Sequence, residues 1–287
     1  MPGLNPERAD IILAGAAILD AFMQALDLPD MHISERGLRE GLLVDYLLKH
    51  EDAALLAGLS VRARSVLQLG RACQSDEAHA RATARLALAL FDSGRDAGLH
   101  RLGAWERELL EYTALLHHIG AFLTYTDYQV HTHYLIRHAN LLGFDQKEIA
   151  MMATTALYQR KALPRKKDPE FAALDARAQQ SVRVLSVFLR LAKHLDRSHA
   201  GLVQQAWLHP IDANHVALHI HAPHDCQVEV WGLQKRAEAF EKVFGRSLVI
   251  KVLAPLPAPA APWEAERPAA PYAPVLAAPP TRPPRRA

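Results

Sequence analysis

Cysteine is nearly absent from this sequence. Its only two cysteines, Cys73 and Cys226, lie far apart and fit no metal-binding or redox spacing. A disulfide framework is therefore excluded, and a reduced, cytoplasmic compartment is the simplest interpretation. The N-terminal stretch MPGLNPERAD has no apolar core of the kind found in a signal peptide, which agrees with that expectation.

Long hydrophobic runs and a surplus of one charge are missing as well. Apolar runs such as IILAGAAIL are too short to cross a bilayer, so no membrane association is expected. The formal net charge is only +2, and overall charge therefore predicts no partner. Half of the 287 residues are apolar, which is typical of a globular protein with one large domain or two smaller ones.

Helical periodicity dominates the first two hundred residues. Apolar side chains recur there at three- and four-residue spacing, as on the buried face of a helix. Pro6 and Pro29 flank the first predicted helix, a short β-like stretch MHIS follows it, and Ser34 is a plausible N-cap for the next helix. The predicted helices cover 6–28, 37–50, 58–73, 75–92, 104–120, 128–141, 145–159 and 174–198.

The pattern changes after Gly201. WLHPID and HVALHIHA alternate apolar and polar residues, as strands do, and SLVIKVL is a further β run after the helical pattern VEVWGLQKRAEAFEKVF. Residues 254–287 hold eleven of the eighteen prolines, so we expect a disordered Pro/Ala/Arg tail. The predicted fold class is mainly α: a helical bundle, a small α+β (β-β-α-β) appendage and this tail.

Histidine is frequent, with sixteen residues, and two of them are adjacent in the apolar stretch LLHHIGAFL. His117 and His118 end one predicted helix, His79 lies in the first turn of another, and His131 begins a third, while Asp196 lies late in the longest. Side chains from separate helices of a bundle can converge on a divalent metal ion. A histidine at a helix end is more often a capping or packing residue, so both interpretations stay open.

Several motifs resemble, in their order, one known family. They are HAxxxxxLALALFD, LLHHIG, HTHYLI, LLGF, YQRKALPRKKDPEF and FLRLAKHLDRSH, with RADIILAG and SERGLREGLL before them and FEKVFGRSL after them. Together, over about residues 5–252, they resemble the C-terminal HD-type helical domain of the exopolyphosphatase/guanosine pentaphosphate phosphatase (Ppx/GppA) family. Each motif alone is weak, but their shared order is specific.

The resemblance implies a metal-binding set of the HD type. It places the upstream histidine at His79, the His-Asp pair at His117 and His118, and the late aspartate at Asp196, with His131 at a position where related domains add a histidine. The pair's aspartate is therefore replaced by a histidine, and Gln159 stands where the family usually has His in YHRK. Four candidate ligands are enough for one divalent ion such as Zn²⁺ or Ni²⁺. A two-metal hydrolytic site is not expected.

The resemblance also divides the chain. Residues 1–33 resemble the closing helix and a short strand of the family's actin-like phosphatase half, whose glycine-rich phosphate loops do not occur here. The HD-type domain is predicted over 34–202, the α+β subdomain over 203–253 and the tail over 254–287. The apolar face of the first helix either folds onto the helical domain or presents a docking surface; it carries Ile11, Ile12, Ile18, Leu19 and Phe22.

A basic loop is the remaining functional candidate. It contains Arg160, Lys161, Arg165, Lys166 and Lys167, and Arg197 is a candidate extension of its positive surface. Polyphosphate is a dense polyanion, and basic residues gain affinity for such a chain by releasing its counterions. A merely solvated loop is the alternative. Nucleic acid is not favoured, because no aromatic residues interleave this cluster to stack on bases.

Three functional hypotheses follow. The leading one is a non-catalytic accessory domain that binds polyphosphate or a similar phosphate-rich anion, a phosphatase half, or both. The second is a metal-dependent phosphohydrolase that uses His79, His117, His118 and Asp196. The third is a fragment of a longer exopolyphosphatase. A homodimer is implied only by the resemblance, because full-length relatives are typically dimers.

Overall fold

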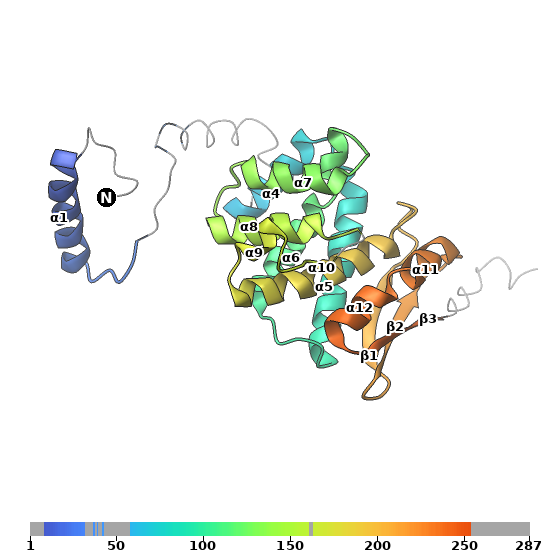
Figure 1. Cartoon of the computed structure of the whole chain (residues 1–287). Coiled ribbons are helices and arrows are strands. Elements are labelled where there is room, and N and C mark those ends of the chain that lie inside the picture. Colours follow the sequence, from blue (N-terminus) through green and yellow to red (C-terminus); the bar gives the residue numbers. More distant parts are fainter. Residues whose placement is uncertain are drawn as a thin grey trace, which may run out of the picture. The chain divides into compact units, whose positions relative to one another are not determined.

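The computed structural model describes residues 9–31, 58–160 and 163–253, together with Gly37, Arg39 and Leu42. The chain divides at Gly58 into two compact units (Figure 1). The first contains α1 (Ala9–Ala25), and the second contains the elements from α4 onwards. Most of the predicted helix 37–50 and the whole predicted tail lie outside the described residues. No described helix combines the length and hydropathy needed to span a bilayer.

The second unit begins with a helical bundle, and three of its helices start at an aspartate that caps the helix. The side chains of Asp76, Asp145 and Asp175 accept hydrogen bonds from backbone N–H groups in the first turns of α5, α8 and α10. The elements are α4 (Val61–Ala72), α5 (Glu77–Asp96), α6 (Ala104–Leu116), the 3₁₀ helix η2 (Ile119–Phe122), α7 (Tyr128–His138), α8 (Gln146–Leu157), α9 (Pro169–Ala172) and α10 (Ala176–Leu195).

A small sheet completes the unit. β1 (Gln205–Pro210) pairs antiparallel with β2 (His215–His221), and β2 pairs parallel with β3 (Ser247–Leu253), so the sheet order is β1-β2-β3. The helices α11 (Gln227–Gln234) and α12 (Ala237–Phe244) connect β2 to β3 (Figure 1). The fold class predicted from the sequence, mainly α with a β-β-α-β appendage, is confirmed.

Helix α10 is the centre of this unit. Its first half packs in one buried cluster with α4, α6 and α8, where Val182 is fully buried. Its second half packs in another with α5, the inner face of the sheet and α12, where the ring of Phe188 lies 5.4 Å from that of Phe244. The helical part and the α+β part therefore share one core, and the end of α10 lies at their junction.

Two predicted helices were wrong in their extent. The helix expected over 104–120 ends at Leu116, and the one expected over VEVWGLQKRAEAFEKVF breaks at Lys235 and Arg236 into α11 and α12. The break lets α11 pack on the end of α10 while Phe240 of α12 is fully buried in the core of the sheet. Tertiary packing thus overrides a local helical pattern at both places.

Candidate functional site

The paired histidines lie where the chain turns from α6 into η2. His117 is fully buried, and its Nδ1–H donates to the carbonyl oxygen of Ala114 at 2.7 Å. The backbone carbonyl of His117 accepts hydrogen bonds from Gln159 Nε2 (2.6 Å) and Thr132 Oγ1 (3.3 Å). Side chains from α7 and the end of α8 therefore fix the position of this turn.

The structure brings three of the predicted ligands into one buried chain of hydrogen bonds. His79 Nδ1 lies 2.7 Å from Asp196 Oδ2, and His79 Nε2 lies 3.2 Å from His117 Nε2. The second oxygen of Asp196 accepts the N–H of Gly201 at 2.8 Å. His79 and Asp196 are each only 2 % exposed.

The hydrogen-bond pattern indicates which nitrogen atoms of His79 and His117 carry protons. Burial, followed by the charge of His79, holds the pKa of His117 well below its usual value, so the imidazole of His117 is neutral. Because its Nδ1–H donates to a carbonyl oxygen, its Nε2 is an acceptor. His79 Nε2 must then donate to it. His79 Nδ1 and the carboxylate of Asp196 are joined by a hydrogen bond on the other side of the ring.

His118 and His199 form the more accessible side of the cluster. The ring of His199 stacks on His79 with centroids 3.6 Å apart, and its Nδ1 lies 3.2 Å from Asp76 Oδ2. Burial, followed by the charge of Lys193, lowers the pKa of His118 to about 4. Sequence reasoning missed His199, although it ends the motif FLRLAKHLDRSH; only the fold brings it over His79.

A cluster of cations adjoins these histidines, and we call it the Lys193 cluster. Lys193 is largely buried, and burial followed by nearby arginines lowers its pKa to about 7. Its Nζ donates to the phenol oxygen of Tyr128, and no ion pair joins it to a carboxylate within the described part of the chain. The arginines that act most strongly on it are Arg160, Arg236, Arg197 and Arg190.

Tyr128 connects the histidines to the Lys193 cluster. Its buried ring lies 4.7 Å from the ring of His118, 4.8 Å from Lys193 Nζ and 5.5 Å from the guanidinium carbon of Arg160. The two groups of side chains therefore form one continuous site at the ends of α6 and α10.

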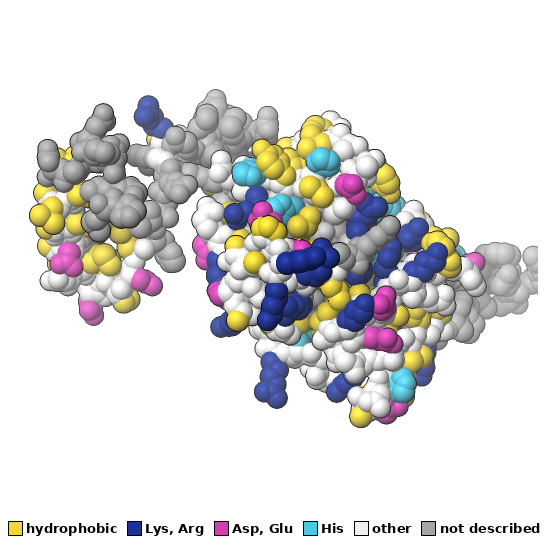
Figure 2. Space-filling model, in the orientation of Figure 1, with side chains coloured by type: hydrophobic (Ala, Val, Ile, Leu, Met, Phe, Trp, Pro, Cys, Tyr) yellow, Lys and Arg dark blue, Asp and Glu magenta, His cyan; other side chains and the backbone are white. Residues whose placement is uncertain are grey.

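The basic loop predicted from the sequence is only partly joined to this site. Arg160 contacts Asp127 and Gln129, whereas Arg165 pairs with Asp168. Lys166 and Lys167 are exposed, and Lys161 lies outside the described residues. A depression of about 350 Å³ is lined by Arg160 and Arg165 but also by Asp127 and Asp168. Lys and Arg side chains gather on the face over α9, α10 and the α11–α12 segment (Figure 2).

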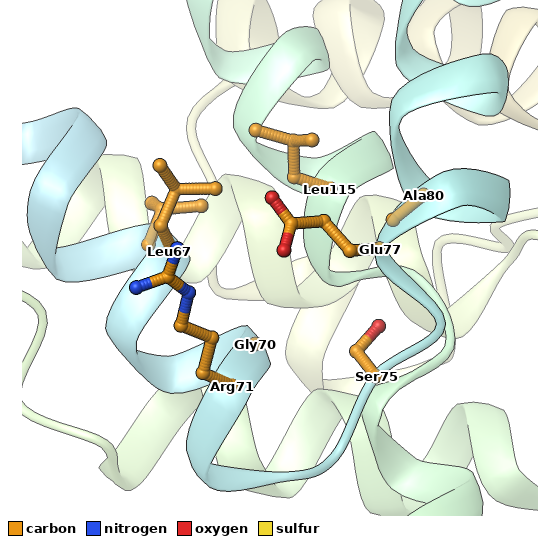
Figure 3. A pocket seen from close by; sticks show the side chains of 8 residues that line it. Leu67, Gly70, Arg71, Ser75, Glu77, Ala80 and Leu115 are labelled. Atoms are coloured by element: carbon orange, nitrogen blue, oxygen red, sulfur yellow. The ribbon is translucent and has the colours of Figure 1, made fainter. Parts of the chain in front are cut away.

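A second pocket lies between α4, α5 and α6, away from this site. Figure 3 shows the carboxylate of Glu77 directed toward Leu67 and Leu115, with Arg71 beside it. The pocket has a volume of about 20 Å³, which is room for roughly one water molecule. It is too small to hold a substrate.

Comparison with known protein families decides the kinship of the chain. A family model described as Ppx/GppA phosphatase, domain III, matches residues 61–234, and a model of the Ppx/GppA phosphatase family matches residues 1–50. The chain belongs to the Ppx/GppA phosphatase family. The resemblance seen in the sequence motifs is thereby confirmed.

Individual relatives agree with this assignment. A guanosine-5'-triphosphate,3'-diphosphate pyrophosphatase from Photobacterium profundum is 30 % identical over 192 residues, covering 66 % of this chain and 36 % of the relative. Proteins of the same name from Pseudoalteromonas translucida and Vibrio vulnificus are 27 % and 30 % identical, covering 65 % and 56 % of this chain and 36 % and 31 % of the relatives. The chain thus spans about a third of the length of the curated relatives it matches.

The metal set implied by membership of the Ppx/GppA family does not fit the arrangement found here. Within the described residues, no group of three or more His, Cys, Asp or Glu side chains is placed to hold a metal ion. The Asp196 carboxylate faces the Nδ1 of His79, and the Nε2 atoms of His79 and His117 face each other. His131 has no hydrogen bond or ring contact with this cluster among the described residues. The donor atoms therefore bond one another instead of a common ion.

The buried histidines of the Ppx/GppA domain predict a loss of stability in acid. Burial is the main cause that lowers the pKa of His118 to about 4 and that of His194 to about 3, and it also lowers the pKa of His117. Between pH 6.5 and these values the unfolded chain binds protons that the folded chain does not, so stability falls as the pH falls. We expect the Tm at pH 5 to lie about 5 °C or more below that at pH 7.

Thermal unfolding at the two pH values measures this effect, with His194→Gln as the test variant and the exposed His224→Gln as its control. His194→Gln should reduce the difference in Tm between the two pH values, and His224→Gln should leave it unchanged. Equal Tm values for the wild type at pH 5 and pH 7 would contradict the prediction.

Proposed function

We propose that this Ppx/GppA-family chain is a non-catalytic domain that binds polyphosphate or a similar phosphate-rich anion at the Lys193 cluster. The observation that carries the proposal is the environment of Lys193. This largely buried ammonium group is bonded to a neutral phenol, shares the ring of Tyr128 with Arg160 and feels the charges of further arginines, without a carboxylate partner within the described residues.

Such an arrangement is unfavourable without an anion. Burial and like charges both oppose the protonated form of Lys193, which is why its pKa falls to about 7. An anion with several negative charges reverses the sign of the local potential and restores the ammonium form. Phosphate groups suit this role because guanidinium groups bind them in a bidentate manner.

The exposed basic residues support a chain-like ligand rather than a single phosphate. Lys166 and Lys167 are exposed on the loop before α9, and Arg165 of the same loop lines one depression together with Arg160. A polyphosphate bound at the Lys193 cluster extends toward them and gains affinity from released counterions. Because this contribution is electrostatic, affinity falls steeply with added salt.

The arrangement of the histidines supports a non-catalytic role. A hydrolytic centre of the HD type needs a cation to activate water and to stabilise the leaving oxygen. Here His118 takes the place of the pair's aspartate, and the remaining donors satisfy one another. The relatives are named as pyrophosphatases, but this chain covers only about a third of their length.

The first unit supports a further part of the proposal, which is a phosphatase half as partner. Residues 1–50 match the Ppx/GppA family model, and within the first unit, taken by itself, α1 leaves a row of large apolar side chains uncovered. Ile11 is 66 % exposed, Ile18 is 72 % exposed and Phe22 is 58 % exposed. Exposed apolar surface of this kind is typical of a docking site.

Titration with polyphosphate tests the anion site. We expect binding at low salt that weakens in high salt, and a loss of about tenfold or more in affinity for Lys193→Met. Methionine matches the length of the lysine stem without its buried charge, so the variant should fold. Lys242→Met on α12, where Lys242 pairs with Glu238, is the control and should keep near wild-type affinity. No binding at low salt, or an equal loss in both variants, counts against the proposal.

A phosphatase assay tests the enzyme alternative. The assay is run on the purified chain with Mn²⁺, Ni²⁺ or Zn²⁺ added, and His117→Ala is compared with the wild type. We expect no turnover in either protein. Metal-dependent hydrolysis that His117→Ala abolishes would establish a phosphohydrolase and overturn the non-catalytic assignment.

A further inference from the structure

Strand β3 lies at the end of the sheet, and no described part of the chain pairs with its free side. The sheet order β1-β2-β3 gives it β2 as its single neighbour. The one further backbone bond described for it runs from the N–H of Ser247 to the carbonyl oxygen of Asn214, just before β2. None of its residues is fully buried, and Val252 is 49 % exposed. One row of its backbone N–H and C=O groups can therefore pair with a further strand.

The opposite edge of the sheet, formed by β1, is partly closed by side chains of α5. The N–H of Leu208 donates to Ser93 Oγ at 3.0 Å, and Arg85 donates to the carbonyl oxygens of Val203 and Gln204 just before the strand. Edge strands in proteins are usually protected by such a cover, by proline, by several charges or by a short length. β3 has seven residues, SLVIKVL, with no proline and a single charge. It therefore lacks the usual protection against pairing.

The two faces of β3 differ in their chemistry. Leu248 and Ile250 pack against the core on the inner face, and Val252 follows in the same row because side chains alternate along a strand. On the outer face, Lys251 lies beside His219 of β2 in the register of the sheet. Lys251 has no ion pair with any carboxylate that the structure describes. A matching strand needs apolar residues toward the core and a carboxylate opposite Lys251.

Two segments of the chain itself match this requirement poorly. Residues 254–287, which follow β3, hold eleven of the eighteen prolines, and proline has no N–H to donate to a neighbouring strand. The strand β3 of a second copy has the right alternation, but the sequence SLVIKVL contains no carboxylate. Lys251 would then face only uncharged or like-charged side chains. The charge of Lys251 therefore favours a strand from a different protein.

We propose that the free edge of β3 binds an extended segment of a partner protein, which alternates apolar and polar residues and places an acidic residue opposite Lys251. Backbone hydrogen bonds supply the affinity in such strand addition, and alternate side chains supply the specificity. The apolar residues of the segment extend the inner row of Leu248, Ile250 and Val252, and they cover Val252. This inference does not depend on the anion site at the Lys193 cluster.

Short capped peptides test the edge. The first alternates valine with threonine and has a central glutamate, the second has lysine in place of that glutamate, and the third is the glutamate peptide with N-methylated backbone amides. Fluorescence anisotropy measures their binding to the full chain, and mass spectrometry follows hydrogen exchange of the β3 amides. We expect the glutamate peptide to bind about fivefold tighter than the lysine peptide and to protect the β3 amides. The methylated peptide should not bind, because it lacks backbone donors.

Substitutions at Lys251 test the preference for an acidic partner. Lys251→Glu should reverse the order of the glutamate and lysine peptides, and Lys251→Gln, which only removes the charge, should make their affinities equal. Both variants leave the backbone edge of β3 unchanged. Arg101 is exposed on the loop between α5 and α6, and Arg101→Glu provides the control for a reversed charge elsewhere. This control should keep the wild-type order of the two peptides.

Each other result counts against the inference. If the glutamate peptide does not bind, or if the methylated peptide binds equally well, no strand is added to β3. An unchanged preference for glutamate in Lys251→Glu overturns the assignment of an acidic partner. Protection of the β3 amides that rises with protein concentration in the absence of peptide identifies a second copy as the occupant, and it overturns the proposal as well.

Discussion

Replacing Gly120 with alanine is expected to destabilise the domain by about 3 kcal/mol, the upper end of the usual cost of overpacking. A Cβ at this position would lie 2.1 Å from the carbonyl oxygen of Tyr128 and 2.4 Å from the amide nitrogen of Thr132. Both are backbone atoms of α7, so no side chain can move to relieve the clash. The first turn of α7 would have to separate from η2.

That separation would also reach the histidines. The N–H of Gly120 donates to Thr132 Oγ1 at 3.0 Å, and the same hydroxyl donates to the carbonyl oxygen of His117. Both bonds depend on the close approach of η2 and α7. Urea unfolding should therefore show a lower midpoint for Gly120→Ala, accompanied by a change in the near-ultraviolet circular dichroism.

Gly70→Ala is the matched control. Gly70 lies in α4, and a Cβ there would meet nothing within 4 Å. Alanine is the better helix former, so this variant is expected to be neutral or to gain up to about 1 kcal/mol. A Gly120→Ala protein as stable as the wild type would show that η2 and α7 are less closely packed than described above.

Asp196→Ala is expected to cost about 3 kcal/mol of unfolding free energy, the usual penalty for breaking a buried ion pair. Asp196 and His79 are joined by a hydrogen bond of 2.7 Å inside the core, and Asp196 also accepts the N–H of Gly201. Removal of the carboxylate leaves a buried imidazole and a backbone amide without acceptors.

Asp196→Asn should recover part of that loss, since its amide oxygen can accept one of the two hydrogen bonds. Glu238→Ala removes the partner of Lys242 from an exposed pair on α12 and is expected to cost less than about 1 kcal/mol. Urea denaturation of the three variants measures the differences. If Asp196→Ala proved no more costly than Glu238→Ala, the buried pair would not be a structural element of the fold.

Local pattern was enough to predict much of the fold. The strand predicted over SLVIKVL is found over the same residues, Ser247–Leu253, and the helix predicted over 75–92 begins at Glu77 with Asp76 as its N-cap. These features depend on neighbours in sequence: alternation of apolar residues for a strand, and a side-chain acceptor for a helix N-terminus.

Features that depend on distant contacts could not be predicted. Helix α6 ends early because the chain turns there and brings Gly120 close to the backbone of Tyr128. Tyr128 lies in the next helix, beyond the reach of a local sequence pattern. Likewise, Lys193 reads in the sequence as an ordinary basic residue in the last turn of an amphipathic helix. Tyr128 and the arginines that contribute to its lowered pKa come from other parts of the fold, which the local pattern does not reveal.

The candidate site shows the same division. His79, His117 and Asp196 were placed together by resemblance to a family, and the structure brings them together. Their hydrogen bonds to one another were not predicted, because ring orientation is set by packing. His199 was missed, since a single histidine in a sequence gives no sign of what its ring will lie against.

The position of Tyr128 links the histidines to the cations, because its ring contacts both groups. Under the proposed function, an anion that draws the ammonium of Lys193 away from the phenol changes the charge felt by His118, whose ring contacts the ring of Tyr128. By thermodynamic linkage, a proton bound at His118 changes the affinity for the anion by the same factor by which the anion changes the affinity of His118 for that proton. Under the proposed function, the histidine cluster thereby responds to an anion bound at the Lys193 cluster, even without turnover.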